Sequence, residues 1–207
     1  MSGLLLKEFL SAKKYLRSLA GLLFLYIGLS LVWKNVSFLT GVGALVSVMI
    51  GFSSFSFDVQ SKWDCYALSL PVRRKDVVKS RYLFSLICVG GGLLYILIFG
   101  LLLVLITHES TRVFFQSLLA SLILCLLFLS LILPVNYRFG AEKGRILLAA
   151  IALIIVVLFT LTDRLFSNPL PLFSNYQTFL FLLALFSAFV LYLSYCLSCA
   201  IYAKKEF

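Results

Sequence analysis

Residues 58–82 read DVQSKWDCYALSLPVRRKDVVKSRY, and this stretch is the longest charged interruption in a chain that is otherwise strongly apolar. It holds six of the eighteen lysine and arginine residues and three of the eight acidic residues. The stretch starts with a helical pattern, stops at Pro71 and continues as a basic cluster. A protein that only filled a bilayer would not need such a loop, so the pattern indicates a partner in the cytosol.

The apolar segments on either side of this loop are typical of an integral membrane protein. Hydrophobic residues make up 62% of the 207 residues, and the mean hydropathy is +1.09, which is more apolar surface than a soluble domain can bury. Apolar runs recur near the ~20 residues that a helix needs to cross a bilayer, and no period-two alternation suggests a barrel. The sequence predicts an all-α domain over residues 1–207 with spans at 15–33, 36–57, 83–107, 113–135, 146–162 and 179–203.

The distribution of basic residues predicts the orientation of these spans. Fifteen of the eighteen lysine and arginine residues lie in the N-terminal segment, the 58–82 and 136–145 loops and the C-terminal tail. Lys34, Arg112 and Arg164 lie on the other side. Because cytoplasmic loops carry the excess of basic residues, both termini are predicted to be cytoplasmic. The net charge of +10 is then a topology signal, and its spread over several segments disfavours a nucleic-acid partner.

Motifs for catalysis and energy coupling are missing from the sequence. Apart from Arg17 at the start of the first span, the six predicted spans hold no Asp, Glu, Lys, Arg or His, although ion-coupled transporters and intramembrane proteases usually need such groups at depth. Neither a Walker phosphate-binding loop nor an H-E-x-x-H motif occurs. The C-x-x-C of Cys196 and Cys199 has no histidine or acid nearby and is interpreted as helix packing. We therefore predict no catalytic residue, no metal site and no cofactor in this chain.

The N-terminal residues 3–14 are predicted to form an amphipathic helix. One face holds Leu5, Phe9, Ala12 and Leu16, and the opposite face holds Lys7, Ser11 and Lys14. Such a helix can lie in the membrane interface with its lysines toward anionic head groups, or it can serve only as a basic anchor that sets the orientation.

Small residues in two spans predict close helix packing. Gly43, Ser47 and Gly51 recur every fourth position, which lets this helix approach a neighbouring helix or a second subunit closely. Gly90–Gly92 mark a close crossing, with a bend as the alternative. The segment 163–178 carries two prolines among apolar residues, and it is predicted to be either an external loop or a re-entrant element.

The first half of the 58–82 loop has the pattern of a helix of three turns. Its apolar stripe consists of Val59, Trp63, Tyr66, Ala67 and Leu70. Asp58 can cap the helix and pair with Lys62, and Pro71 ends it. Tryptophan and tyrosine with mixed charges are typical of protein interfaces, but they also serve as anchors at a membrane surface, and both interpretations stay open on periodicity alone.

The residues Ser61–Leu83, SKWDCYALSLPVRRKDVVKSRYL, carry a resemblance to a known family. A Lys-Trp-Asp run, a Leu-Pro turn, a basic cluster and a Val-Val pair before the third span resemble the pattern of ABC-2 type transporter permeases. The order of elements is also similar, with an N-terminal helix, two spans, a loop, four spans and a short basic tail. Within this family, the chain is most similar to compact bacterial permeases that include exporters of cytolytic and antimicrobial peptides.

The resemblance implies a type V exporter-like transmembrane domain in a bacterial cell membrane. Residues 58–70 would be a coupling helix that fits a groove on a separate ATPase subunit, and Leu4–Lys14 would be an interfacial elbow helix. The expected ATPase contacts are Asp58, Lys62, Trp63, Asp64, Tyr66 and Leu70. ATP and magnesium would bind to the ATPase, and a second permease copy or a paralogue would complete the pore. The alternative is a membrane scaffold or immunity protein that binds a cytosolic partner without transport.

Overall fold

The computed structural model describes residues 2–33, 36–60, 63, 73–107, 110–165 and 176–204, and these ranges are helical almost throughout. The helices are α1 (Ser2–Trp33), α2 (Val36–Gln60), α4 (Arg74–Thr107), α5 (Thr111–Leu165) and α6 (Tyr176–Lys204). No strand occurs within the described ranges. The all-helical class predicted from the sequence is therefore confirmed for this part of the chain.

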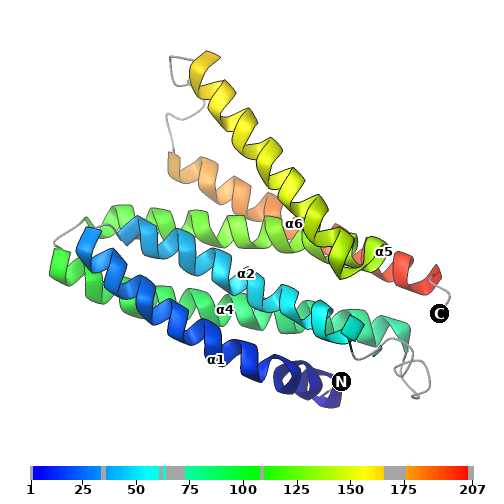
Figure 1. Cartoon of the computed structure of the whole chain (residues 1–207). Helices are drawn as coiled ribbons and strands as arrows, with labels where there is room; N and C mark the ends of the chain where they lie inside the picture. The colour runs from blue at the N-terminus through cyan, green and yellow to red at the C-terminus, as the bar shows by residue number, and fades with distance from the viewer. Residues whose placement is uncertain are drawn as a thin grey trace.

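The helices pack as a bundle in which α2 and α4 lie side by side (Figure 1). α1 covers α2 and α4, while α6 packs against α4 and α5. Both termini lie at the same end of the bundle as the end of α2 and the start of α4 (Figure 1). This arrangement gathers the basic residues near both termini and at the start of α4 at one end of the molecule, as the charge distribution requires.

Four described helices are long and apolar enough to cross a membrane, and a fifth is added if the bent pair in α1 counts as one span. The four candidate spans are Val36–Ser53, Arg74–Thr107, Thr111–Gly140 and Leu180–Lys204. In α1, the segments Gly3–Lys13 and Arg17–Trp33 meet at an angle of 51°. This bend separates the expected interfacial helix from the expected first span.

The predicted fifth span, residues 146–162, is helical but is not among these candidates. It belongs to the second part of α5, which follows a break at Gly140. Gly140 has φ 81° and ψ 167°, a backbone conformation that residues other than glycine rarely adopt. Beyond this residue α5 changes direction and diverges from α6 (Figure 1). Residues 166–175 of the predicted external or re-entrant segment lie outside the described residues.

Two helices are longer than the sequence predicted at their ends near the loop. α2 continues through Gln60, and α4 begins at Arg74, so each helix projects beyond its predicted span. The 34 residues of α4 correspond to a length of about 51 Å, compared with about 30 Å for the hydrocarbon core of a bilayer. The ionisable residues in the first turns of α4 can therefore lie at the interface while the rest of the helix crosses the membrane.

The small residues of α2 face α4 of the same chain. An added Cβ at Gly43 would lie 2.8 Å from Ile96 Cγ1, and one at Gly51 would lie 3.1 Å from the Ser85 side chain. An added Cβ at Gly92 would overlap the Ser47 hydroxyl. Gly43, Ser47 and Gly51 are all buried, and they lie in the packing of α2 on α4. α4 also runs through Gly90–Gly92 as one helix, which favours the crossing over the bend.

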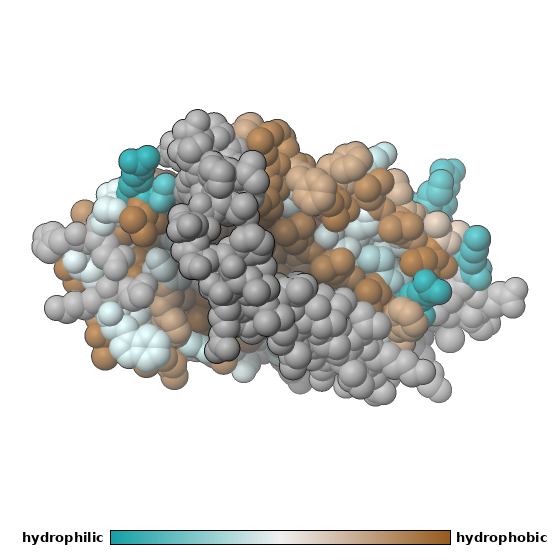
Figure 2. Space-filling view, turned by 90° about the horizontal axis from the view of Figure 1, so that it is seen from above, coloured by the Kyte–Doolittle hydropathy of each residue, from teal (hydrophilic) through white to brown (hydrophobic). Residues whose placement is uncertain are grey.

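The surface is apolar in the middle of the molecule and polar toward its ends. Figure 2 shows hydrophobic side chains over the central part of the visible face and hydrophilic side chains near both ends, among the residues that are coloured. The exposed apolar side chains include Leu94, Ile98 and Leu105 on α4 and Leu182, Phe186 and Phe189 on α6. A band of this kind is the surface that lipid tails cover in a membrane protein.

We predict that Gly92→Ala destabilises the protein by about 1–3 kcal/mol, because overpacking forces two closely packed helices apart. Gly91→Ala is the matched control, since a Cβ at Gly91 meets no atom within 4 Å. Both substitutions raise helix propensity equally, so the control should be neutral or stabilising by up to about 1 kcal/mol. Thermal unfolding in detergent measures both variants, and equal melting temperatures would contradict the close α2–α4 contact.

Candidate functional site

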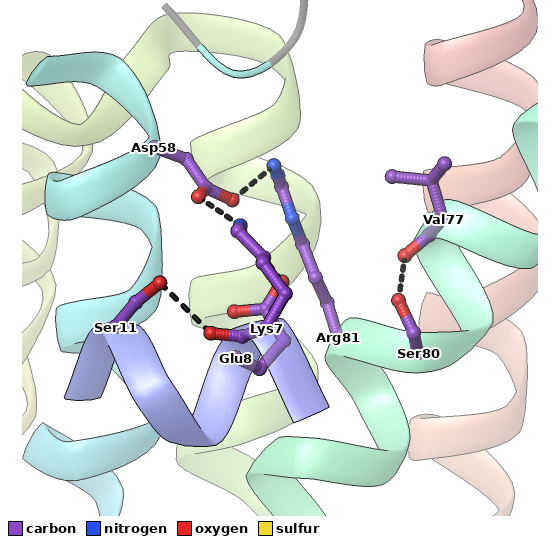
Figure 3. A network of polar contacts seen from close by, with 7 residues as sticks. All are labelled: Lys7, Glu8, Ser11, Asp58, Val77, Ser80 and Arg81. Atoms are coloured by element: carbon purple, nitrogen blue, oxygen red, sulfur yellow. Dashed lines mark hydrogen bonds and ion pairs between the residues drawn. The ribbon is translucent and has the colours of Figure 1, made fainter. Parts of the chain in front are cut away.

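A buried carboxylate, that of Asp58, lies near the end of α2, where the predicted cytoplasmic loop begins. Its side chain is 4% exposed. Oδ1 accepts a hydrogen bond from Lys7 Nζ of α1, and Oδ2 accepts one from Arg81 Nη2 of α4 at 2.6 Å. Figure 3 shows the Asp58 carboxylate between these two cations. One aspartate thus joins three helices that come from distant parts of the sequence.

Glu8 completes this group of charges, which we call the charge cluster: Lys7, Glu8, Asp58 and Arg81. Lys7 Nζ lies 3.3 Å from Glu8 Oε1, and the side chain of Glu8 is 3% exposed. Two cations and two anions therefore balance in a region from which water is largely excluded. Such pairing is required, because an unpaired charge that is buried is strongly destabilising.

Further contacts hold the N-terminal part of α1, which carries Lys7 and Glu8, in place. Ser11 Oγ donates to the Lys7 carbonyl at 2.8 Å within α1 (Figure 3). On the same helix Ala12 is fully buried, and Phe9 contacts Phe84 of α4 with ring centroids 5.2 Å apart. The N-terminal part of α1 is therefore fixed by apolar packing as well as by charge.

Burial and charge act in opposite directions on Asp58. Burial raises the pKa of this carboxyl, and the negative charge of Glu8 adds to the rise, whereas Arg81 and Lys7 lower it. The net effect is a raised pKa. The ionised form of Asp58 consequently depends on both cations, and removal of either one raises this pKa further.

The charge cluster also contacts a residue of the loop and a residue of α5. Lys7 Nζ lies 4.4 Å from the centre of the Trp63 ring, a distance at which a cation and an aromatic ring attract. The guanidinium carbon of Arg81 lies 5.4 Å from the centre of the Tyr137 ring. Lys7 is thus shared between the end of α2 and the loop, and Arg81 is shared between α2 and α5.

The predicted partner-binding residues fall into two groups. Asp58 and Trp63 are described, and both contact Lys7. Lys62, Asp64, Tyr66 and Leu70 lie outside the described residues. Asp58 belongs to α2, whose last residue is Gln60, and its carboxylate is directed into the bundle. Its expected contribution to partner binding would therefore be indirect, through Lys7 and Trp63.

Three members of the charge cluster make contacts that were not predicted from the sequence. Lys7 was expected on a face toward lipid head groups, but it contacts Asp58 and Trp63. Glu8 and Arg81 were not singled out. A signal was present, because Glu8 shares a helix face with Leu5 and Ala12, and Arg81 follows Val77 by one turn. Charges that interrupt an apolar face are candidates for buried ion pairs.

Within the described residues, no group of three or more histidine, cysteine, aspartate or glutamate side chains could hold a metal ion. The described cysteines Cys88, Cys125, Cys196 and Cys199 are free thiols. The charge cluster can transmit movement, because it links the loop to α1, α2 and α4 at one end of the bundle.

A known protein family matches nearly the whole chain. The sequence profile described as ABC-2 family transporter protein matches residues 3–203. The chain belongs to the ABC-2 transporter family. Neither a curated relative nor a solved structure matches it. The family and the candidate spans together identify a multi-pass membrane protein, and membership suggests the permease subunit of an ABC transporter, which is a transmembrane component without catalytic activity of its own.

We predict that Asp58→Asn destabilises this ABC-2 protein by about 3 kcal/mol, because the change leaves Lys7 and Arg81 without a full counter-charge in a buried position. Asp76→Asn is the control, since Asp76 lies in the first turn of α4 and is not fully buried. Loss of its favourable interaction with the helix dipole should cost less than about 1 kcal/mol. Thermal unfolding in detergent measures both, and similar losses would argue against a central role for the charge cluster.

Proposed function

We propose that this chain is the permease subunit of an ABC exporter that is driven by a separate ATPase subunit. Family membership over residues 3–203 supports the class. The absence of a Walker loop from the whole sequence supports an ATPase on another polypeptide, which would bind ATP and magnesium. Both termini and the loop between α2 and α4 are cytoplasmic in this proposal, because the basic residues concentrate there.

The observation that carries the proposal is the contact of Trp63 with the charge cluster. Trp63 belongs to the loop that resembles a coupling helix, and its ring lies 4.4 Å from Lys7 Nζ. Through Lys7, the loop reaches Asp58 of α2, and through Asp58 it reaches Arg81 of α4. A force applied to this loop therefore has a direct path of charged contacts to three helices.

The proposed cycle uses this path. ATP binding closes the two ATPase subunits, and the closure moves the loops that lie in their grooves. Trp63, and with it Lys62, Asp64, Tyr66 and Leu70, would contact the ATPase. The charge cluster then passes the displacement to α1, α2 and α4, and the spans change between inward-facing and outward-facing arrangements. A second copy of the chain or a paralogue supplies the other half of the pore.

The spans also indicate the class of cargo. Apart from Arg17, the six predicted spans hold no Asp, Glu, Lys, Arg or His. A hydrophobic or amphipathic cargo, such as a membrane-active peptide, fits such a path because it needs no buried charge for recognition. We therefore propose export of an amphipathic peptide or a similar molecule.

We predict that Trp63→Ala weakens the binding of the ATPase encoded beside this chain, or uncouples its activity, because truncation of an interface tryptophan typically costs 2 kcal/mol or more, or about thirtyfold in affinity. Co-purification and the ATPase rate of the reconstituted complex measure the two effects. Asp64→Ala probes the neighbouring predicted contact.

Trp33→Ala is the matched control, because Trp33 is the other tryptophan of the chain and lies 60% exposed at the far end of α1. It should leave assembly and ATPase rate unchanged. Intact assembly and coupling in both the Trp63→Ala and Asp64→Ala variants would reject the loop as the coupling element. A chain that binds a cytosolic partner but never alters an ATPase rate would favour the scaffold alternative.

A further inference from the structure

We infer that Arg74 and Tyr82 are positioning residues that attach the last span, α6, to the helix that follows the loop, so that α6 moves together with α4. The attachment, which we call the polar seam, consists of Arg74 and Tyr82 of α4 with Ser194, Ser198 and the last carbonyls of α6. This inference rests on the proposed function, because it concerns the part of the bundle that the loop would move.

The first contact of the polar seam lies where the loop meets α4. Arg74 Nη1 donates to the Ala203 carbonyl at 2.7 Å and lies 3.5 Å from the Tyr202 carbonyl. The last carbonyls of a helix have no partner within the helix, and a cation there also complements the helix dipole. Arg74 thus acts as the cap of α6, although Arg73 and Lys75 beside it have the same charge.

The second contact lies two turns further along α4, inside the bundle. The Tyr82 hydroxyl lies 2.8 Å from Ser194 Oγ and 2.8 Å from Ser198 Oγ. The three side chains are 4%, 3% and 0% exposed, and the Tyr82 ring packs edge-to-face on Tyr195. Ser194 and Ser198 are one helical turn apart, so a single hydroxyl can bond both.

The two contacts together fix the orientation of α6 relative to α4 as well as the distance between the two helices. Arg74 and Tyr82 are separated by about 12 Å along α4, and their partners follow one another in the opposite direction along α6. Only 17% of the α6 span is buried, compared with 67% of the α2 span. The polar contacts of α6 are therefore among its few buried positions, and in an apolar environment separated hydroxyl groups have no water to bond instead.

The polar seam provides a second set of contacts through which movement of the loop can reach the spans. The charge cluster connects the end of α2 to α1, and the polar seam connects the start of α4 to α6. Because the loop lies between Gln60 and Arg74, the two attachments are on its two sides. Displacement of the loop would then act on the first and the last span at the same time.

The attachment is tested first on the isolated chain in detergent. Hydrogen exchange of the C-terminal amides of α6 should rise about threefold in Tyr82→Phe, the change expected for loss of one typical hydrogen bond in a membrane protein. Arg74→Gln should have a similar effect, and Arg74→Lys should restore protection because lysine can also bond terminal carbonyls. Tyr192→Phe and Arg73→Gln are the controls, since among the described contacts Arg74 and Tyr82, but neither of these two residues, bond between α4 and α6.

The joint movement is tested in the complex with the ATPase. Spin labels at Lys75 and Lys204, both exposed, report the separation of α4 and α6 in a variant without reactive cysteines. We expect the same separation without nucleotide and after trapping with ATP, magnesium and vanadate, but different separations in the Arg74→Gln/Tyr82→Phe double variant. A wild-type separation that changes with nucleotide, or unchanged exchange in the variants, would overturn the inference.

These results are distinguishable from failure of the proposed function. If no ATPase binds the chain, the exchange measurements still decide whether the polar seam holds α6. If the ATPase binds and Trp63→Ala uncouples it, but the labels separate in the wild-type complex, the permease assignment stands and the joint movement of α4 and α6 is rejected.

Discussion

The burial of the Asp58 carboxylate is the constraint on which the cytoplasmic end of this structure depends. A carboxylate at 4% exposure can stay ionised only if cations surround it, because its own desolvation raises its pKa. Lys7 and Arg81 meet this requirement from two other helices. The positions of α1, α2 and α4 are therefore not independent at this end, since movement of any one of them would expose a charge to an apolar environment.

The remainder of the bundle satisfies a different constraint, which is close packing without charge. Along α2 and α4, glycine and serine let two backbones approach, and the side chains of Ile96 and Ser85 fill the space that glycine leaves. Tyr82 and Arg81 are neighbours in α4, yet they face different partners, Ser194 and Ser198 on one side and Asp58 on the other. The first turns of α4 are thus the point where the ionic and the hydrogen-bonded contacts meet.

Most of the fold class could be predicted from the sequence, because apolar runs of membrane length have few alternatives. The family could also be predicted, since the loop pattern around Trp63 and Pro71 lies in one continuous segment of the sequence. The charge cluster could not be predicted as a unit, because its members are separated by up to 74 positions and pair only in three dimensions. The break at Gly140 could not be predicted either, because glycine permits a positive φ but does not require it.

The contacts of Lys7 with Glu8 and with the distant Asp58 have a consequence for biosynthesis. Lys7 and Glu8 both leave the ribosome before the rest of the charge cluster does, since Asp58 follows Lys7 by 51 positions and Arg81 follows Asp58 by 23. Until α4 has been inserted, the charge cluster is incomplete. The N-terminal part of α1 therefore stays at the aqueous surface of the membrane. The docking of this part of α1 is then a late step of assembly, because it requires that α2 and α4 are already in place.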